Sequence, residues 1–239
     1  MKRATITVVG VLLLTAGFSL IKSFGPSFVV MTQQIAVGNS LRSFRIVVPH
    51  RVKHPGVIFA FHGAGDTPET MAKYSRLDQL AASKGILLIY PASLEETWAL
   101  ESPSQSPNSD IQFFDVLQQD VIERFNVDKR RMYVVGMSDG GAFAQLLAIS
   151  HGASIAAIVS HSSPRRLSDS SSSSDVPILV IIGDQDSQVS TVRMDAEKHR
   201  LAGQPIEYLE VANLGHTWAT TLNDHIWEFL AKHELRKSQ

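Results

Sequence analysis

The sequence predicts an α/β fold in which a mostly parallel central sheet is covered by helices on both faces. From residue 41 onward, short β-branched runs alternate with helix-like segments, which is typical of sheets built from strand–helix–strand units. Several of these runs are apolar without polar alternation, as expected for strands that are buried on both faces. We identify no internal repeat and no second domain, so residues 41–235 are predicted to form one catalytic domain.

The first expected elements follow from their local patterns. Residues 44–49 alternate in polarity and predict an edge strand, whereas the near-continuous apolar run at 56–63 predicts a buried strand. The segment 68–85 is predicted to be one helix, because Pro68 stands near its start and Gly85 at its end.

A helix over residues 110–126 has apolar positions at helical spacing, and Asp110 is its expected N-terminal cap. The other expected elements are strands at 86–91, 131–137, 154–163, 176–186 and 204–212, helices at 140–151 and about 219–233, and polar loops at 92–109 and 164–176. Neither loop is long enough for a large lid domain, so we expect an open cleft at the carboxyl ends of the strands, where ligands bind in such sheets.

The composition excludes several classes of function. The chain has 239 residues with 22 basic and 23 acidic side chains, so its charge gives no reason to expect nucleic-acid binding. It contains no cysteine, which excludes disulfides, a thiolate nucleophile and cysteine-based metal or iron–sulfur sites. We expect neither a cofactor nor a metal ion.

The N-terminus predicts export. Lys2 and Arg3 precede an apolar run at residues 4–21, which is the charge order of a secretory signal. The run is also nearly long enough to span a bilayer, and no clean cleavage site follows it. Residues 1–30 are therefore expected to be either a signal peptide or an N-terminal membrane anchor, with the protein secreted, periplasmic or held at the membrane.

A serine in a tight turn is the first candidate for chemistry. Ser138 lies in Gly136-Met137-Ser138-Asp139-Gly140, between a predicted strand and a predicted helix. A nucleophile on such a turn has a strained backbone, and glycines two positions away on either side remove collisions with it. The following helix directs free N–H groups and a positive dipole toward the serine. A helix cap with packing glycines is the alternative interpretation.

A serine hydroxyl needs a base to take its proton, and that base is expected on a late loop. His216 follows the last predicted strand, whereas the other histidines lie in helices, on polar stretches or, as His161 does, at an earlier strand end. The imidazole in turn needs a carboxylate, and Asp184 and Asp186 directly follow a buried strand. The order serine, aspartate, histidine is that of the α/β-hydrolases.

The oxyanion that forms during acyl transfer needs N–H donors. The predicted strand at 56–63 ends in His62-Gly63-Ala64-Gly65, whose small residues let backbone N–H groups approach a ligand. The N–H group of Asp139, directly after the serine, is the expected second donor.

With these residues in place, the sequence resembles the α/β-hydrolase esterases related to polyhydroxybutyrate depolymerases and feruloyl esterases. The resemblance extends from about residue 43 to residue 233. It rests on the segments "FHGAGDT", "YPASLEETWAL", "IIGDQDSQV", "GHTW" and, as the most specific, "DIQFFDVLQQDVIERFNVDKRRMYVVGMSDGG". It implies an α/β-hydrolase fold, and the short loops at 92–109 and 164–176 leave no room in this prediction for a large lid domain.

The resemblance also implies roles for single residues. Ser138 matches the family's nucleophile and His216 its base. Asp186 matches the acid and is thereby preferred over Asp184, although Ile182 stands where the family's acid motif has a histidine.

Four further positions are assigned in the same way. Ala64 and Asp139 match the backbone positions of the oxyanion hole. Trp98 and Trp218 would flank the cleft and bind substrate, although both residues fit the core equally well.

The expected function is that of a serine carboxylic ester hydrolase that acts through an acyl-enzyme. The expected substrates are small or polymer-derived esters: aryl esters of the feruloyl type, short-chain acyl esters or hydroxyalkanoate esters. Two alternatives stay open, a serine peptidase of the same fold and a non-catalytic binding protein at the cell envelope.

Overall fold

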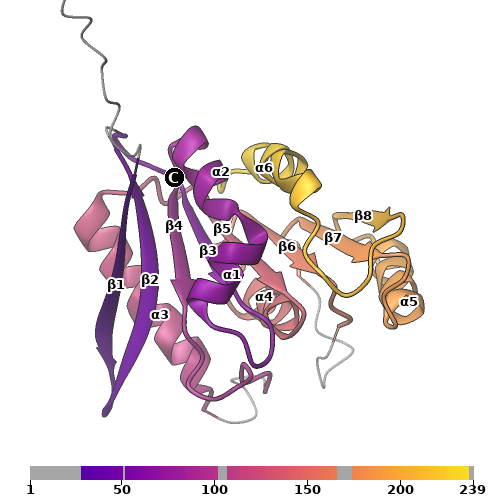
Figure 1. The fold of residues 1–239 in the computed structure, drawn as a ribbon, viewed down its shortest axis with the longest axis horizontal. Coiled ribbons are helices and arrows are strands. Elements are labelled where there is room, and N and C mark those ends of the chain that lie inside the picture. The colour runs from indigo at the N-terminus through magenta and orange to yellow at the C-terminus, as the bar shows by residue number, and fades with distance from the viewer. Residues whose placement is uncertain (1–27, 51, 102–106, 166–173, 237–239) are drawn as a thin grey trace, which may run out of the picture.

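The computed structural model describes residues 28–50, 52–101, 107–165 and 174–236. These residues build one eight-stranded sheet in the order β1-β2-β4-β3-β5-β6-β7-β8 (Figure 1). The strands are β1 (Phe28–Val37), β2 (Ser40–Pro49), β3 (Val57–Phe61), β4 (Leu87–Pro91), β5 (Met132–Met137), β6 (Ala157–His161), β7 (Ile178–Gly183) and β8 (Ile206–Val211). The helices are α1 (Pro68–Ser75), α2 (Leu77–Lys84), α3 (Ser109–Phe125), α4 (Asp139–Ser150), α5 (Val189–Leu201), the 3₁₀ turn η1 (Thr220–Leu222) and α6 (Asn223–Ala231).

The sheet is mostly parallel, as predicted. Strand β2 pairs with β1 and β4 in antiparallel fashion. From β4 through β3, β5, β6 and β7 to β8, all neighbouring strands are parallel. Strands β3 to β7 are buried along their whole length. Their largely apolar sequences fit this burial, because a parallel strand is covered on both faces.

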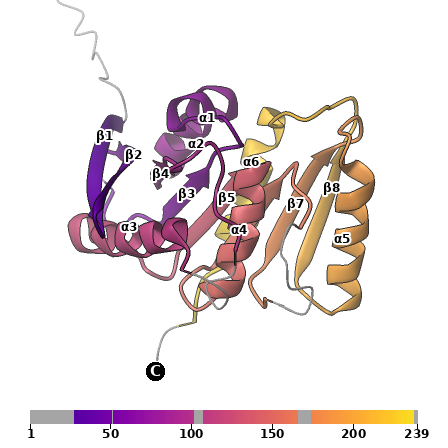
Figure 2. The same ribbon diagram turned by 90° about the horizontal axis from the view of Figure 1, so that it is seen from below.

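Helices lie on both faces of the sheet, as Figure 2 shows. Helices α1, α2 and α6 cover one face, and α3, α4 and α5 cover the other. The apolar side chains accordingly form two cores. One contains Phe59 of β3 packed on Phe114 of α3, and the other contains Tyr133 of β5 together with Phe229 of α6.

The sheet begins earlier than predicted. Strand β1 pairs with β2 along its whole length, from Phe28 opposite Pro49 to Val37 opposite Ser40. It forms the edge of the sheet, so the prediction that residues 44–49 are an edge strand is wrong. The structured domain likewise starts before residue 41. Strand β1 is only partly buried, and the polar residues Thr32, Gln33 and Gln34 interrupt its apolar sequence, so it lacks the long apolar run by which buried strands are recognised.

Two helix predictions also need correction. The single helix expected over 68–85 is split into α1 and α2 at Arg76, whose left-handed backbone (φ 56°) ends the first helix. Asp110 is not the cap of α3. That role belongs to Asn108, whose side chain accepts hydrogen bonds from the N–H groups of Asp110 and Ile111. The sequence patterns predict neither α5 nor the 3₁₀ turn before α6.

Part of the predicted N-terminal segment cannot be compared with the structure. Residues 1–27 lie outside the described residues, as do residues 166–173 of the serine-rich loop. In the part of the chain that the structure describes, no helix is long and apolar enough to cross a membrane.

The topology places several loops at one edge of the sheet. Because β3, β5, β7 and β8 are parallel, their carboxyl ends point the same way and meet at that edge. The loops that follow these strands carry residues 62–66, Ser138, residues 184–188 and His216.

Candidate active site

Ser138 occupies a sharp turn between β5 and α4, with φ 53° and ψ −116°. A positive φ is strained for any residue other than glycine, and such strain is typical of functional sites. The backbone around the turn is tightly packed. A Cβ atom on Gly136 would lie 2.0 Å from the carbonyl oxygen of Gly140, and a Cβ on Gly140 would lie 2.1 Å from that of Phe61. The turn therefore admits only glycine at both positions.

The imidazole of His216 reaches Ser138 from the loop after β8. Its Nε2 atom lies 3.0 Å from Ser138 Oγ, which is hydrogen-bonding distance. The loop is held against the end of β7, because the N–H of Gln185 donates to the carbonyl of Leu214 at 2.9 Å. The side chain of His216 is 41% exposed, so a small molecule can approach the pair from solvent.

Asp186 completes a chain of three side chains. Its Oδ2 lies 2.7 Å from Nδ1 of His216, and its side chain is fully buried. Its other oxygen accepts a hydrogen bond from the backbone N–H of Gln188 at 3.0 Å. Asp184, the competing acid, is exposed to solvent, and the carboxylate that lies against the imidazole is that of Asp186.

This arrangement fixes the tautomer of His216. An ionised carboxylate only accepts hydrogen bonds, so Nδ1 carries the proton that it donates to Asp186. Nε2 then presents a lone pair to the hydroxyl of Ser138. The imidazole is thus oriented to accept the hydroxyl proton.

The loop after β3 lies beside the serine. A Cβ atom on Gly63 would lie 3.5 Å from Cβ of Ser138. Ala64, the next residue, is exposed, and its N–H group has no hydrogen-bond acceptor among the described residues. Asp139 is buried directly after the serine, at the first position of α4. The two predicted oxyanion positions therefore lie on segments that flank Ser138.

A second histidine, His161, lies beside the turn that carries Ser138. His161 ends β6, is fully buried, and accepts a hydrogen bond at Nε2 from the N–H of Ala219 at 3.0 Å. Its carbonyl oxygen accepts a hydrogen bond from the N–H of Ser138 at 2.8 Å. Burial, and secondarily the neighbouring His216, hold the pKa of His161 at about 3, so its ring is neutral at physiological pH.

Trp218 does not line an open cleft. Its side chain is buried and stacks on the ring of His161, with centroids 4.9 Å apart. Its Nε1 donates to Asn223 Oδ1 at 2.9 Å. The structure therefore supports the interpretation of Trp218 as a core residue rather than as a substrate-binding one.

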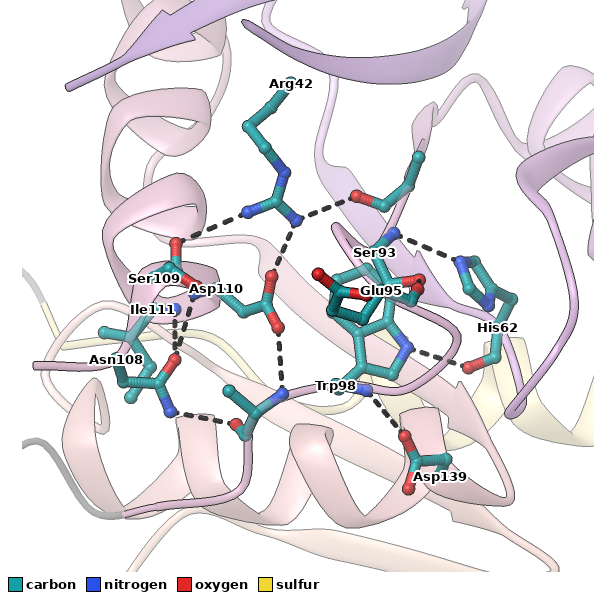
Figure 3. A network of polar contacts seen from close by, with 12 residues as sticks. Arg42, His62, Ser93, Glu95, Trp98, Asn108, Ser109, Asp110, Ile111 and Asp139 are labelled. Atoms are coloured by element: carbon teal, nitrogen blue, oxygen red, sulfur yellow. Dashed lines mark hydrogen bonds and ion pairs between the residues drawn. The ribbon is translucent and has the colours of Figure 1, made fainter. Parts of the chain in front are cut away.

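Trp98 is buried as well, and it belongs to the polar network in Figure 3. Its ring packs between Phe61 and Phe143, with centroids 5.0 and 5.2 Å away. Its backbone N–H donates to Asp139 Oδ2 at 2.7 Å, and its Nε1 donates to the carbonyl of His62 at 2.9 Å. Trp98 thus connects the segments on either side of Ser138, and the predicted contact with substrate does not fit its burial.

The same network contains a buried ion pair that the sequence patterns do not reveal. Arg42 of β2 donates to Asp110 Oδ1 at 2.6 Å, and the two side chains are 3% and 4% exposed. The neighbouring His62 is buried too, and burial lowers the pKa of its imidazole. No local pattern marks the pair, because 68 positions separate its two members in the chain.

Among residues 28–50, 52–101, 107–165 and 174–236, no group of three or more histidine or acidic side chains is arranged to hold a metal ion.

The sequence is similar to known esterases. The family model described as esterase PHB depolymerase matches residues 48–178. Among curated proteins, the putative esterase NocK of Nocardia uniformis subsp. tsuyamanensis is 26% identical over 165 residues, which are 64% of this chain and 48% of NocK. Feruloyl esterase B of Neurospora crassa is 26% identical over 117 residues, or 47% of this chain and 40% of that protein. The chain thus matches less than half the length of either relative.

Solved structures share the fold. FphF, a fluorophosphonate-binding serine hydrolase of Staphylococcus aureus, superposes with a TM-score of 0.72 at 13% identity, covering 85% of this chain and 98% of that one. A ferulic acid esterase superposes with a TM-score of 0.68 at 19% identity, covering 85% and 96%. The predicted α/β-hydrolase fold is confirmed by these likenesses. Because the matched residues 48–178 exceed half of the 239, the chain belongs to the PHB depolymerase esterase family.

Proposed function

We propose that this protein is a serine carboxylic ester hydrolase that acts through an acyl-enzyme. The observation that carries the proposal is the continuous chain of hydrogen bonds from Ser138 through His216 to Asp186, with heavy-atom distances of 3.0 and 2.7 Å. The membership of a family of esterases supports the same reaction.

In the first half of the reaction, Nε2 of His216 takes the proton from Ser138 as the serine oxygen attacks the ester carbonyl carbon. The carbonyl becomes a tetrahedral oxyanion, and the imidazolium is stabilised by the carboxylate of Asp186. His216 then gives its proton to the leaving alcohol, the ester C–O bond breaks, and an acyl-serine remains.

In the second half, water replaces the alcohol. His216 takes one proton from the water, whose oxygen attacks the acyl carbon, and returns that proton to Ser138 as the acid leaves. The net reaction consumes one ester and one water and produces one alcohol and one acid.

The oxyanion of both tetrahedral intermediates needs two donors. We assign this role to the backbone N–H groups of Ala64 and Asp139, because the loops that carry them flank Ser138. Donors of this kind typically contribute about 10²- to 10³-fold each to kcat. The positive end of the α4 dipole acts in the same direction.

The substrates we propose are esters with an accessible carbonyl, either aryl esters of the feruloyl type, short-chain acyl esters or hydroxyalkanoate esters. The exposure of His216 favours substrates that need no enclosed tunnel. Curated relatives include a feruloyl esterase, which supports the aryl class as the first to test.

The test is hydrolysis by the purified protein of p-nitrophenyl esters of increasing chain length and of methyl ferulate. Replacing Ser138 with alanine should reduce turnover by about 10³-fold or more, since only binding and the oxyanion donors would remain. Ser187 is an exposed serine on the loop of Asp186, and Ser187→Ala is the matched control that should retain activity. Undiminished turnover by Ser138→Ala would contradict the proposal.

The alternatives predict different results in the same assay. A peptidase should cleave matched anilides at rates comparable with the esters, and a non-catalytic binding protein should cleave neither.

For localisation we propose export, on the basis of Lys2, Arg3 and the apolar run that follows. Recovery of the protein in the cytosolic fraction of its host alone would contradict export.

A further inference from the structure

We propose that Trp98 and Asp110 are positioning residues for the oxyanion hole. They act by fixing residues 96–99, which we call the bracing segment, and both expected N–H donors are tied to this segment. The inference rests on the proposed function. It assigns a role to the buried polar network drawn in Figure 3.

The bracing segment forms hydrogen bonds to the loop after β3 on both sides of Ala64, the first expected donor. Nε1 of Trp98 donates to the carbonyl of His62 at 2.9 Å. The N–H of Gly65 donates to the carbonyl of Glu96 at 2.7 Å. These two contacts flank Ala64 in the sequence, so the direction in which its N–H points depends on where the bracing segment lies.

The bracing segment also holds the second donor. The backbone N–H of Trp98 donates to Asp139 Oδ2 at 2.7 Å, and both residues are buried. The indole stacks on Phe143 of α4, with the rings inclined by only 20°. One residue, Trp98, therefore contacts both segments that supply the expected donors and sets the spacing between them.

At its C-terminal end the bracing segment is bound to the ion pair of Asp110 and Arg42. The N–H of Ala99 donates to Asp110 Oδ2 at 2.8 Å, and the carbonyl of Ala99 accepts a hydrogen bond from Asn108 Nδ2 at 2.9 Å. The other oxygen of Asp110 is paired with Arg42. Arg42 also donates to the carbonyl of Ala92 at 2.9 Å. The ion pair therefore binds the segment that follows β4 at both Ala92 and Ala99.

Stability alone is a weak explanation for such a network. Replacing a buried ion pair by apolar residues is often neutral or stabilising, so the pair is not needed merely to fill the core. Directional hydrogen bonds, in contrast, can fix a segment that has no helix or strand of its own, as is the case for residues 93–101. Precision matters here, because a displacement of about 1 Å can cost about 100-fold in rate.

Strand β2 offers a matched control. Arg45 forms a second ion pair from this strand, with Asp78 on α2, and the side chains are 12% and 13% exposed. Tyr90 also donates to Asp78, at 2.8 Å. This pair has no hydrogen bond to the bracing segment among the described residues. Asp78→Asn therefore removes a similar charge without changing any hydrogen bond to the bracing segment.

The experiment compares an ester with the thionoester of the same acid and alcohol. Sulfur is larger than oxygen and accepts hydrogen bonds more weakly, so a well-formed oxyanion hole favours the oxygen substrate. The ratio of kcat/KM for the two substrates is measured on one preparation, and partial unfolding lowers both values equally. It therefore reports the oxyanion hole rather than the amount of folded enzyme.

The variants are Trp98→Phe, which removes the indole donor to His62 together with part of the buried ring, and Asp110→Asn. For both we expect kcat on the ester to fall by about tenfold or more with KM changed less than about threefold, because the donors act in the transition state. The oxygen-to-sulfur ratio should fall by about tenfold in both variants, a fraction of the effect of losing one donor. Asp78→Asn should keep the wild-type ratio.

An unchanged ratio in Trp98→Phe overturns the inference, even if kcat falls. Asp110→Asn leaves the buried charge of Arg42 without its counter-charge and can fail to fold, in which case Trp98→Phe decides alone. An equal fall of the ratio in Asp78→Asn also overturns it, since the effect would then be general. A wild-type protein that hydrolyses no ester refutes the proposed function and this inference with it, whereas an active wild type with unaltered variants refutes the inference only.

Discussion

Nε2 of His216 lies 3.0 Å from the hydroxyl oxygen of Ser138, although 78 positions separate the two residues in the chain. The contact is a consequence of topology, because β5 and β8 run parallel and their following loops meet at one edge of the sheet. Strand β7, which lies beside β8, delivers Asp186 to the same place.

The first prediction separates the two aspartates that follow β7. Asp186→Asn should reduce kcat by up to about 10⁴-fold, because an amide in its place no longer holds His216 in the tautomer that accepts the serine proton. Asp184→Asn should leave kcat within about twofold, since Asp184 is exposed and surface changes seldom have large effects. Steady-state kinetics on one ester decide the matter. Equal losses in the two variants would contradict the assignment of Asp186.

The second prediction concerns the turn that carries the serine. Gly136→Ala would place a Cβ 2.0 Å from the carbonyl oxygen of Gly140, so the backbone must move. We expect a loss of about 3 kcal/mol or more in the free energy of unfolding, at the upper end of the cost of overpacking. The measurement is denaturant unfolding followed by circular dichroism.

Gly215→Ala is the control for this experiment. A Cβ on Gly215 meets no atom within 4 Å, so the free energy of unfolding should change by less than about 0.5 kcal/mol. Full stability of Gly136→Ala would show that the turn is not as tightly packed as described.

The third prediction concerns the pH dependence of stability. The pKa of His161 is about 3 in the folded protein, against an ordinary value of 6.5. Between these values the unfolded chain binds a proton at this residue that the folded protein does not, so the contribution of His161 to the free energy of unfolding falls as the pH is lowered from 6.5 toward 3. The contribution of one such group is at most about 1.4 kcal/mol per pH unit.

His161→Gln isolates this contribution. Glutamine cannot titrate, and its side-chain oxygen can still accept a hydrogen bond from Ala219. The variant should therefore lose less stability than the wild type between pH 6.5 and pH 4, measured by urea unfolding at several pH values. Parallel curves for the two proteins would mean that His161 does not stay neutral when folded.

Much of the fold could be predicted from the sequence, because its strongest signals are local. The strands from β3 to β7 are buried on both faces and have largely apolar sequences. Strand β1 was missed, since an edge strand with partial burial shows no such run. The break at Arg76 was missed because no glycine or proline marks it, although the backbone there is left-handed.

In the candidate site, too, local patterns indicate some residues and not others. Ser138 and His216 were recognised because the serine turn has a local glycine pattern and the histidine follows the last strand. Asp110 and Trp98, in contrast, act through partners far away in the sequence, on β2 and α4. A local pattern shows a helix cap or a core aromatic at these positions. Only the assembled fold shows that the two residues connect the loops on either side of the serine.

The central claim is that the Ser138 hydroxyl is activated by His216, and covalent labelling with a fluorophosphonate tests it most directly. Intact mass spectrometry and peptide mapping should find one phosphonyl group on the wild-type protein, attached to Ser138, and none on Ser138→Ala. His216→Ala should be labelled at least about 100-fold more slowly, since the base that removes the hydroxyl proton is gone. Labelling at another residue, or at Ser138 with an undiminished rate in His216→Ala, would contradict the account.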